Sequence, residues 1–383
     1  MTFWEIRQGD ALEQLRRIED ETVQCCITSP PYWSLRDYGT ATWVGGDPAC
    51  SHKGRQKPRQ DTTGSGINKG RFAESRGTQP GKTAYSVPVR GVCRCGAERR
   101  DLQLGLEASA EEYVERLVEV MAEVRRVLKA DGTLWLNLGD CYASDAFGGS
   151  IARSGLAGGN KNHVASRAAR TDPRRPFGLK PKQLVGIPWR VAFALQADGW
   201  WLRSDIIWSK TNAMPESVRD RPTKSHEYLF LLAKNERYYY DAAAIAEEAS
   251  GRAPGNVTHK GADAYAAGAE FHRTKSGLVA IGAREVRNKR SVWTVATHPF
   301  PEAHFATFPP ALVEPCILAG SRPGDLVLDP FAGAGTVGLV ALRHGRRFLG
   351  IELNPEYVEM ARRRIVGDAP LWNTPDEPQE AAR

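Results

Sequence analysis

The sequence predicts an open α/β fold, with helices covering a twisted sheet, and two stretches far apart in the chain support this most strongly. The apolar run 23–27 predicts a buried strand that ends in Thr28-Ser29-Pro30-Pro31-Tyr32-Trp33. Late in the chain, strand 326–329 leads into a glycine-rich turn, a helix, and a second strand ending in Glu352. Because ligands in open α/β sheets bind beyond the carboxyl ends of strands, we expect both stretches to form one site.

The loop after the early strand has the composition of a rigid hydrogen-bond acceptor. Each proline fixes φ and removes an N–H, which ends the strand and stiffens the loop. The Ser29 hydroxyl and the Pro30 carbonyl are acceptors suited to the hydrogens of an exocyclic amine on a nucleobase. Tyr32 offers an aromatic face to a base swung out of its helix. Pro30-Pro31 alone is more typical of an ordinary turn, so the functional interpretation depends on the second stretch.

The second stretch is Asp329-Pro330-Phe331-Ala332-Gly333-Ala334-Gly335-Thr336, followed by helix 337–344, which Gly345 ends. Glycines let the backbone approach a ligand closely, and an acidic residue about 20 positions further on can bind a ribose. Glu352 is in that place. The glycines at 333, 335 and 338 also match a dinucleotide pattern, so an NAD-dependent reductase is a rival interpretation. It leaves the Ser-Pro-Pro-Tyr loop unexplained.

Together, Thr-Ser-Pro-Pro-Tyr early and Asp-Pro-Phe-Ala-Gly-Ala-Gly-Thr late resemble the DNA amino-methyltransferases in their permuted, beta-type arrangement. The resemblance implies a Rossmann-like, S-adenosylmethionine-dependent methyltransferase sheet with inserted zinc-binding and DNA-recognition segments. It implies that the target amine is held by Ser29, Pro30, Pro31 and Tyr32. It implies S-adenosylmethionine contacts from Asp10, Thr28, His304, Phe305, Thr307, Asp329, Pro330, Phe331, Ala332, Gly333, Gly335, Thr336 and Glu352. The catalytic domain would comprise residues 1–40, 102–240 and 291–366.

The residue before Pro-Pro bears on the target base. Family members with Ser there more often modify cytosine N4, and those with Asp or Asn more often modify adenine N6, so Ser29 favours cytosine. Adenine N6, an RNA substrate and a catalytically inactive DNA-binding homologue remain alternatives. The thiols at 25, 26, 141 and 316 have no activating neighbours in sequence, which argues against a covalent cysteine route.

Between these stretches, periodicity and capping residues predict the remaining elements. Asp10 and Ser109 are candidate helix caps, and by resemblance Asn137 and Asp140 would lie near the target pocket. The predicted strands are 3–6, 133–138, 200–208 and 227–232, the last with a hairpin partner at 238–240, and the predicted helices are 12–18, 107–130, 188–197 and 310–319.

Three insertions and a tail depart from a bare catalytic domain. Residues 41–101 are basic and poor in core-forming side chains, and they contain four candidate ligands of a structural zinc, namely Cys50, His52, Cys93 and Cys95. Their spacing is shorter than usual in zinc sites, so unrelated free thiols are the alternative. Segments 143–182 and 241–290 are expected to recognise the target DNA, and 367–383 to form a flexible tail.

Composition limits the class of protein. The 383 residues carry a net charge of +7, which favours a polyanionic partner, here double-stranded DNA. No apolar run is long enough to span a bilayer, and residues 1–22 lack a secretory segment, so we expect a cytoplasmic bacterial or phage enzyme. The odd total of seven cysteines does not suggest a disulfide framework. A restriction endonuclease acting separately is a candidate partner, and the chain is expected to be a monomer or homodimer.

Overall fold

The computed structural model describes residues 3–34, 38–50, 93, 95–107, 109–143, 176–249, 286–297 and 308–368. Their helices are α1 (Ala11–Leu15), α2 (Ala110–Val127), α3 (Ile187–Ala197), α5 (Pro310–Gly320), α6 (Thr336–Arg343) and α7 (Pro355–Asp368), with a short 3₁₀ turn at Pro176–Gly178. The strands are β1 (Trp4–Gln8), β2 (Val23–Thr28), β3 (Thr42–Val44), β4 (Glu98–Arg100), β5 (Leu128–Leu138), β6 (Trp201–Ser209), β7 (His226–Ala233), β8 (Glu247–Glu248), β9 (Val286–Arg287), β10 (Val292–Thr294), β11 (Leu326–Asp329) and β12 (Arg347–Glu352).

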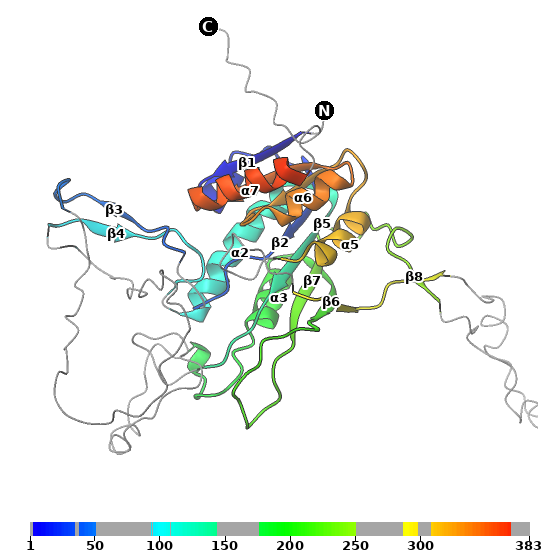
Figure 1. Cartoon of the computed structure of the whole chain (residues 1–383), viewed down its shortest axis with the longest axis horizontal. Coiled ribbons are helices and arrows are strands. Elements are labelled where there is room, and N and C mark those ends of the chain that lie inside the picture. The colour runs from blue at the N-terminus through cyan, green and yellow to red at the C-terminus, as the bar shows by residue number, and fades with distance from the viewer. Residues whose placement is uncertain are drawn as a thin grey trace, which may run out of the picture.

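One eight-stranded sheet dominates the described residues, in the order β1-β12-β11-β2-β5-β7-β6-β10. Only β7 runs antiparallel to its neighbours in this sheet, β5 and β6. Two small antiparallel pairs, β3–β4 and β8–β9, lie outside it, and Figure 1 draws them away from the sheet on opposite sides. The expected α/β fold is therefore confirmed, as a mixed sheet that is mostly parallel.

Successive side chains of a strand point to opposite faces of the sheet. The buried strands are apolar on both faces, and helices cover both. In β2, Cys26 packs with α1, α2 and α3, whereas Cys25 and Ile27 pack with α5, α6 and α7. Every residue of β2 is buried, as expected for a central strand covered on both faces. Within the described ranges, no helix combines the length and apolar character needed to cross a bilayer.

Most predicted elements are present, with shifted ends. The Ser109 cap is confirmed, since its hydroxyl accepts from the Glu112 N–H (3.1 Å). Strand β5 begins at Leu128, five residues before its predicted start, so it includes residues 128–130, which were predicted as the end of a helix. The predicted hairpin partner at 238–240 is wrong: β7 instead pairs with β5 and β6, and Tyr240 stacks on Trp135. The aromatic residues of that segment are used to cover the sheet rather than to extend it.

Strands from opposite ends of the chain are neighbours at the centre of the sheet. β2 and β11 pair in parallel, with Cys25 opposite Val327 and Cys26 opposite Leu328. Their carboxyl ends, from which the two sequence motifs emerge, are therefore at the same edge. The Thr28 hydroxyl donates to Asp329 Oδ1 (2.7 Å), and this buried bond links the two motifs directly.

Candidate active site

The loop after β2 is held from beneath by α2 and the segment before it. The Tyr113 hydroxyl donates to the Pro31 carbonyl (3.0 Å), and the buried Trp33 donates to the Glu107 carbonyl (3.4 Å). A Cβ at Gly105 would lie 2.9 Å from the Tyr32 carbonyl, so glycine is needed for the close approach. Among the described residues, the Pro30 carbonyl accepts no hydrogen bond, so it stays available as an acceptor.

Polar side chains from four elements meet beside this loop. Asn137 on β5 is 2% exposed, and its Nδ2 lies 3.2 Å from Ser29 Oγ, 2.7 Å from the Tyr32 hydroxyl and 3.0 Å from Glu227 Oε2. The Tyr32 hydroxyl donates to the same Glu227 oxygen (2.6 Å). Lys210, just after β6, forms an ion pair with the other Glu227 oxygen. This cluster, hereafter the Glu227 cluster, consists of Ser29, Tyr32, Asn137, Lys210 and Glu227.

Tyr32 is fixed in this cluster by packing as well as by hydrogen bonds. A Cβ at position 139 would lie 2.4 Å from Tyr32 Cε2, so only glycine leaves room for the ring. Burial, and then the nearby Glu227 carboxylate, raise the pKa of Tyr32 well above its ordinary value. The phenol therefore stays protonated at neutral pH and acts as a donor to Glu227.

The glycine-rich loop after β11 is closed against the end of β12. Glu352 accepts from the Gly333 N–H and from the Asn354 N–H, both at 2.8 Å. Each carboxylate oxygen keeps a further lone pair for a hydroxyl. A Cβ at Gly333 would meet nothing nearer than the Phe331 carbonyl at 3.9 Å, so there is open space over this glycine. The acceptor oxygens of Glu352 and this space fit the ribose end of S-adenosylmethionine.

The other motif glycines serve packing. Gly335 has φ +71° at the start of α6, and a Cβ there would lie 2.9 Å from Ala361 Cβ. A Cβ at Gly338 would lie 2.5 Å from Phe348 Cε1, so this glycine lets α6 approach β12 closely. Thr336 is buried at the first turn of α6, where its hydroxyl accepts from Arg364 (2.8 Å).

Asp329 is a buried carboxyl between the two motifs. Oδ1 accepts from Thr28 and from the Phe331 N–H (3.1 Å). Burial raises the pKa of Asp329 from 3.8 to about 7, the Glu352 carboxylate adds to this rise, and the two hydrogen bonds oppose it. Asp329 therefore sits near the midpoint of its titration at neutral pH.

Two further predicted contacts have local structural roles in the described chain. Asp10 caps α1 by accepting from the Glu13 N–H (3.0 Å), which confirms the capping prediction. Asp140 accepts from the backbone N–H groups of Cys141, Gly186 and Ile187, and so anchors the start of α3. The predicted cofactor residues His304, Phe305 and Thr307 lie outside the described residues.

The cysteines of the core are poor nucleophiles. Burial raises the pKa of Cys25 to about 12 and that of Cys316 well above the ordinary value. Cys26 is buried in β2, and burial raises its pKa strongly too. Cys141 has its pKa raised to about 12, mainly by burial. A thiolate pathway is therefore disfavoured at each of these positions.

Three other thiols meet beside the β3–β4 pair. Cys50 ends a turn in which its N–H donates to the Asp47 carbonyl (3.0 Å). Cys93 and Cys95 belong to a second turn, closed by the Gly96 N–H on the Cys93 carbonyl (2.9 Å). Cys50 Sγ lies 3.7 Å from Cys93 Sγ, and all three sulfurs lie within 4.8 Å of one another. Tetrahedral zinc, with Zn–S bonds of about 2.3 Å, holds its sulfurs about 3.8 Å apart.

The surroundings of Cys95 favour a thiolate. Backbone hydrogen bonds from Ala97 and then Asp47 lower the pKa of Cys95 to about 6. A Cβ at Gly46 would lie 2.8 Å from Cys95 Sγ, so glycine is needed beside the sulfur. The fourth predicted ligand, His52, lies outside the described residues. The structure therefore brings three of the four predicted ligands together in a geometry suited to a metal.

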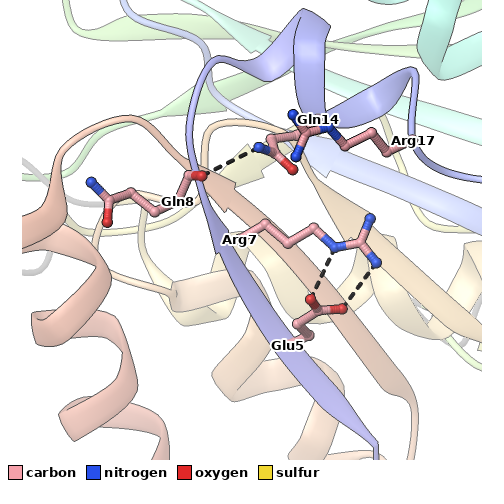
Figure 2. Close-up of a pocket in the computed structure, with 5 residues that line it drawn as sticks. All are labelled: Glu5, Arg7, Gln8, Gln14 and Arg17. Carbon is pink, nitrogen blue, oxygen red and sulfur yellow. Dashed lines mark hydrogen bonds and ion pairs between the residues drawn. The ribbon is translucent and has the colours of Figure 1, made fainter. Parts of the chain in front are cut away.

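An open depression of about 550 Å³ lies at the sheet edge formed by β1 and α1, and Figure 2 shows its lining. Arg7 there is already paired with Glu5 (3.0 Å), and Gln14 donates to the Gln8 carbonyl (3.3 Å). Its lining contains none of the predicted catalytic or cofactor residues. This depression is therefore separate from the candidate active site.

The structure shows an α/β fold in which the two motifs are linked at one sheet edge, and comparison with known proteins identifies the class of protein. A family model described as DNA methylase, of the N6/N4 methyltransferase type, matches residues 23–363. Similar proteins include the type II methyltransferase M.Cfr9I of Citrobacter freundii, 42% identical over 94% of this chain and 87% of that protein. The type II methyltransferase M.SmaI of Serratia marcescens is 40% identical over 94% of this chain and 89% of its own.

The chain belongs to the N6/N4 DNA methylase family, and it is a site-specific DNA methyltransferase. Among solved structures, the cytosine-N4-specific PvuII DNA methyltransferase is similar, with a TM-score of 0.51 at 16% identity over 99% of this chain and 89% of that chain. This likeness shows the shared fold. Membership of the DNA methylase family rejects the NAD-dependent reductase.

Sequence reasoning missed Glu227 and Lys210 as members of the site. Both flank apolar strands, where a charged residue is an ordinary surface position. Lys210 lies 17 residues before Glu227, and Tyr32 lies 195 residues before it, so no local pattern relates them. Asn137 gave a usable signal, because it is an amide within the apolar run of β5.

Proposed function

We propose that this enzyme transfers a methyl group from S-adenosylmethionine to the exocyclic amine of a flipped base, most favourably N4 of cytosine. The observation that supports it best is the Thr28–Asp329 hydrogen bond, which joins the amine-binding loop to the glycine-rich loop at one sheet edge. S-adenosylmethionine, when bound, supplies a methyl group made electrophilic by its sulfonium. The remaining chemistry belongs to the protein.

The protein's part is to hold the amine in a reactive state. Ser29 Oγ and the Pro30 carbonyl accept the two amine hydrogens, which favours a tetrahedral nitrogen whose lone pair points out of the ring plane. The direct transfer needs no covalent enzyme intermediate, in keeping with the raised pKa values of the core thiols. Glu352 and the backbone of Gly333 are placed to receive the ribose. The proposed cofactor role of the segment containing His304, Phe305 and Thr307 extends the same site.

Cytosine is proposed over adenine because Ser29 precedes Pro30-Pro31. The test is to modify DNA with the purified enzyme and labelled cofactor, hydrolyse it to nucleosides, and identify the methylated one by mass spectrometry. N4-methylcytosine is expected. N6-methyladenine would overturn the base assignment alone, and absence of methyl transfer to any DNA would overturn the enzymatic proposal in favour of an inactive homologue.

We further propose that Cys50, Cys93 and Cys95, with His52 as fourth ligand, bind a structural zinc ion. The sulfur spacing, the two facing turns and the backbone hydrogen bonds to Cys95 support it. Protein purified without chelator should contain about one zinc per chain by mass spectrometry. Less than about 0.2 equivalents, with the thiols reduced, would contradict the site and favour free thiols.

The remaining proposals concern the organisation around the catalytic domain of residues 1–40, 102–240 and 291–366. Segment 41–101 would form a basic insertion that the zinc ion holds together. Segments 143–182 and 241–290 would form the target-recognition surface, and residues 367–383 would form a flexible tail. Most of these segments lie outside the described residues. The names of the type II relatives support a role beside a separate restriction endonuclease.

A further inference from the structure

We propose that Glu227, held by Lys210, is a positioning residue that sets the direction of the hydrogen bonds reaching Ser29. In this arrangement the Tyr32 hydrogen points to Glu227, the Ser29 hydrogen points to Tyr32, and Ser29 presents a lone pair to the target amine. The inference rests on the proposed function and adds a residue to it.

The sheet brings the members of the cluster together. In the β5–β7 ladder, Leu138 is opposite Tyr228 and Asn137 opposite Leu229, so Glu227 reaches the carboxyl end of β5. Lys210 follows β6, and its N–H donates to the Ser225 carbonyl (2.8 Å) just before β7. The side chains of Lys210 and Glu227 are only 18% and 15% exposed, so their ion pair is largely shielded from water.

The chemistry of a carboxylate fixes the first link of the chain. An ionised carboxylate only accepts, so the single Tyr32 hydroxyl hydrogen must point to Glu227 Oε2, 2.6 Å away. The Tyr32 oxygen then keeps its lone pairs for other donors. One is the Ser29 hydroxyl, at a long 3.5 Å, and another is Asn137 Nδ2 at 2.7 Å.

The negative charge of Glu227 also fixes the orientation of the Asn137 amide. The amide atom nearest Glu227 lies 3.0 Å from its oxygen, and the carbonyl end of Asn137 in that place would set two acceptors against each other. Nδ2 must therefore face the cluster, where its two hydrogens are shared among three acceptors: Glu227 Oε2, the Tyr32 oxygen and Ser29 Oγ. As a result Asn137 Oδ1 is buried without a hydrogen-bond partner in the described chain. This unsatisfied acceptor costs folding free energy, which the hydrogen bonds of Nδ2 offset.

Ser29 is the end of this chain of donors. Its hydrogen is directed to Tyr32, and one lone pair accepts from Asn137 Nδ2. The other lone pair is left to accept a hydrogen from the target amine. If Glu227 lost its charge, Tyr32 could donate to Ser29, and Ser29 could then donate to the amine nitrogen. That bond would occupy the lone pair that must attack the methyl group. The direction of these hydrogen bonds therefore affects the rate of methyl transfer.

Lys210 fixes the position of the Glu227 side chain. Its Nζ forms the ion pair and lies 4.4 Å from the centre of the Trp208 ring, whose own N–H donates to the Val295 carbonyl (2.8 Å). The ammonium is thus held on a fixed aromatic surface. The ion pair therefore holds the Glu227 carboxylate in place beside Tyr32.

The test is Glu227→Gln, which keeps the size of the side chain but lets it donate. We expect kcat to fall roughly 10- to 100-fold while KM for DNA and for S-adenosylmethionine stays within about twofold, because binding contacts are retained. Glu236→Gln, an equal charge change at an exposed position shortly after β7, should leave kcat unchanged. A loss of thermal stability with raised KM would indicate a merely structural role.

A double-mutant cycle with Ser29→Ala separates this mechanism from independent effects, because the routes through Tyr32 and Asn137 both end at Ser29. If Glu227 acts through Ser29, adding Glu227→Gln to Ser29→Ala should lower kcat less than about threefold further. Full multiplication of the two losses, or a Glu227→Gln enzyme with unchanged kcat, would overturn the inference. An inactive wild-type enzyme would instead overturn the proposed function.

Discussion

At the scale of single residues, Asp329 shows how a buried carboxyl can link two motifs and make stability depend on pH. Its pKa rises from 3.8 in an ordinary environment to about 7 in the fold, mainly through burial. The folded state therefore binds this proton more tightly than the unfolded state. The stability that proton binding by Asp329 contributes is fully present below about pH 4 and is lost as the pH rises through about 7.

Asp329→Asn should remove this dependence, because the amide oxygen can still accept from Thr28 and Phe331 but cannot ionise. Relative to wild type, the variant should gain on the order of 3–4 kcal/mol in unfolding free energy between pH 4 and 8. Urea unfolding at several pH values measures it. The exposed Asp198→Asn is the control, and parallel pH profiles for wild type and Asp329→Asn would contradict the expectation.

At the scale of elements, the contact between α6 and β12 depends on one missing side chain. A Cβ at Gly338 would lie 2.5 Å from Phe348 Cε1 and 2.9 Å from Ile365 Cδ1, both in the core. Gly338→Ala should therefore destabilise the protein by about 1–3 kcal/mol despite the better helix propensity of alanine.

Gly367→Ala in α7 is the matched control, because a Cβ there meets nothing within 4 Å. It should leave stability unchanged or raise it by up to about 1 kcal/mol. Denaturant unfolding of both variants gives the comparison. Equal stabilities of the two variants would show that α6 can shift away from β12 without penalty.

At the scale of the whole molecule, the three-cysteine cluster lies with β3 and β4, outside the eight-stranded sheet (Figure 1). Loss of the proposed metal should therefore leave the catalytic core folded. Cys95→Ser is expected to lower bound zinc to well under one equivalent while the main unfolding transition moves by less than about 2 °C. Calorimetry with metal analysis measures both. A large drop in the main transition would mean that the metal supports the core.

Local sequence patterns were enough to predict the α/β class, the two motif loops, the capped helix α2 and the cysteines of the candidate metal site, because each depends on local periodicity or on short spacing. The sequence predicted that the two motifs lie at the same edge of the sheet, but not that β2 pairs with β11. The ends of β5 and the role of 238–240 were missed, since strand length and partners depend on neighbours far along the chain.

The assembly of the Glu227 cluster depends on the tertiary fold. Lys210 and Glu227 lie beside a loop that precedes them by more than a hundred residues, so no local pattern marks them, and Asn137 was marked only as an amide in an apolar run. What selects them is the register of β5, β6 and β7, which brings one carboxylate within hydrogen-bonding distance of Tyr32 and Asn137. Local physics thus specifies which loops can bind a cofactor or an amine, and the sheet specifies which charges face them.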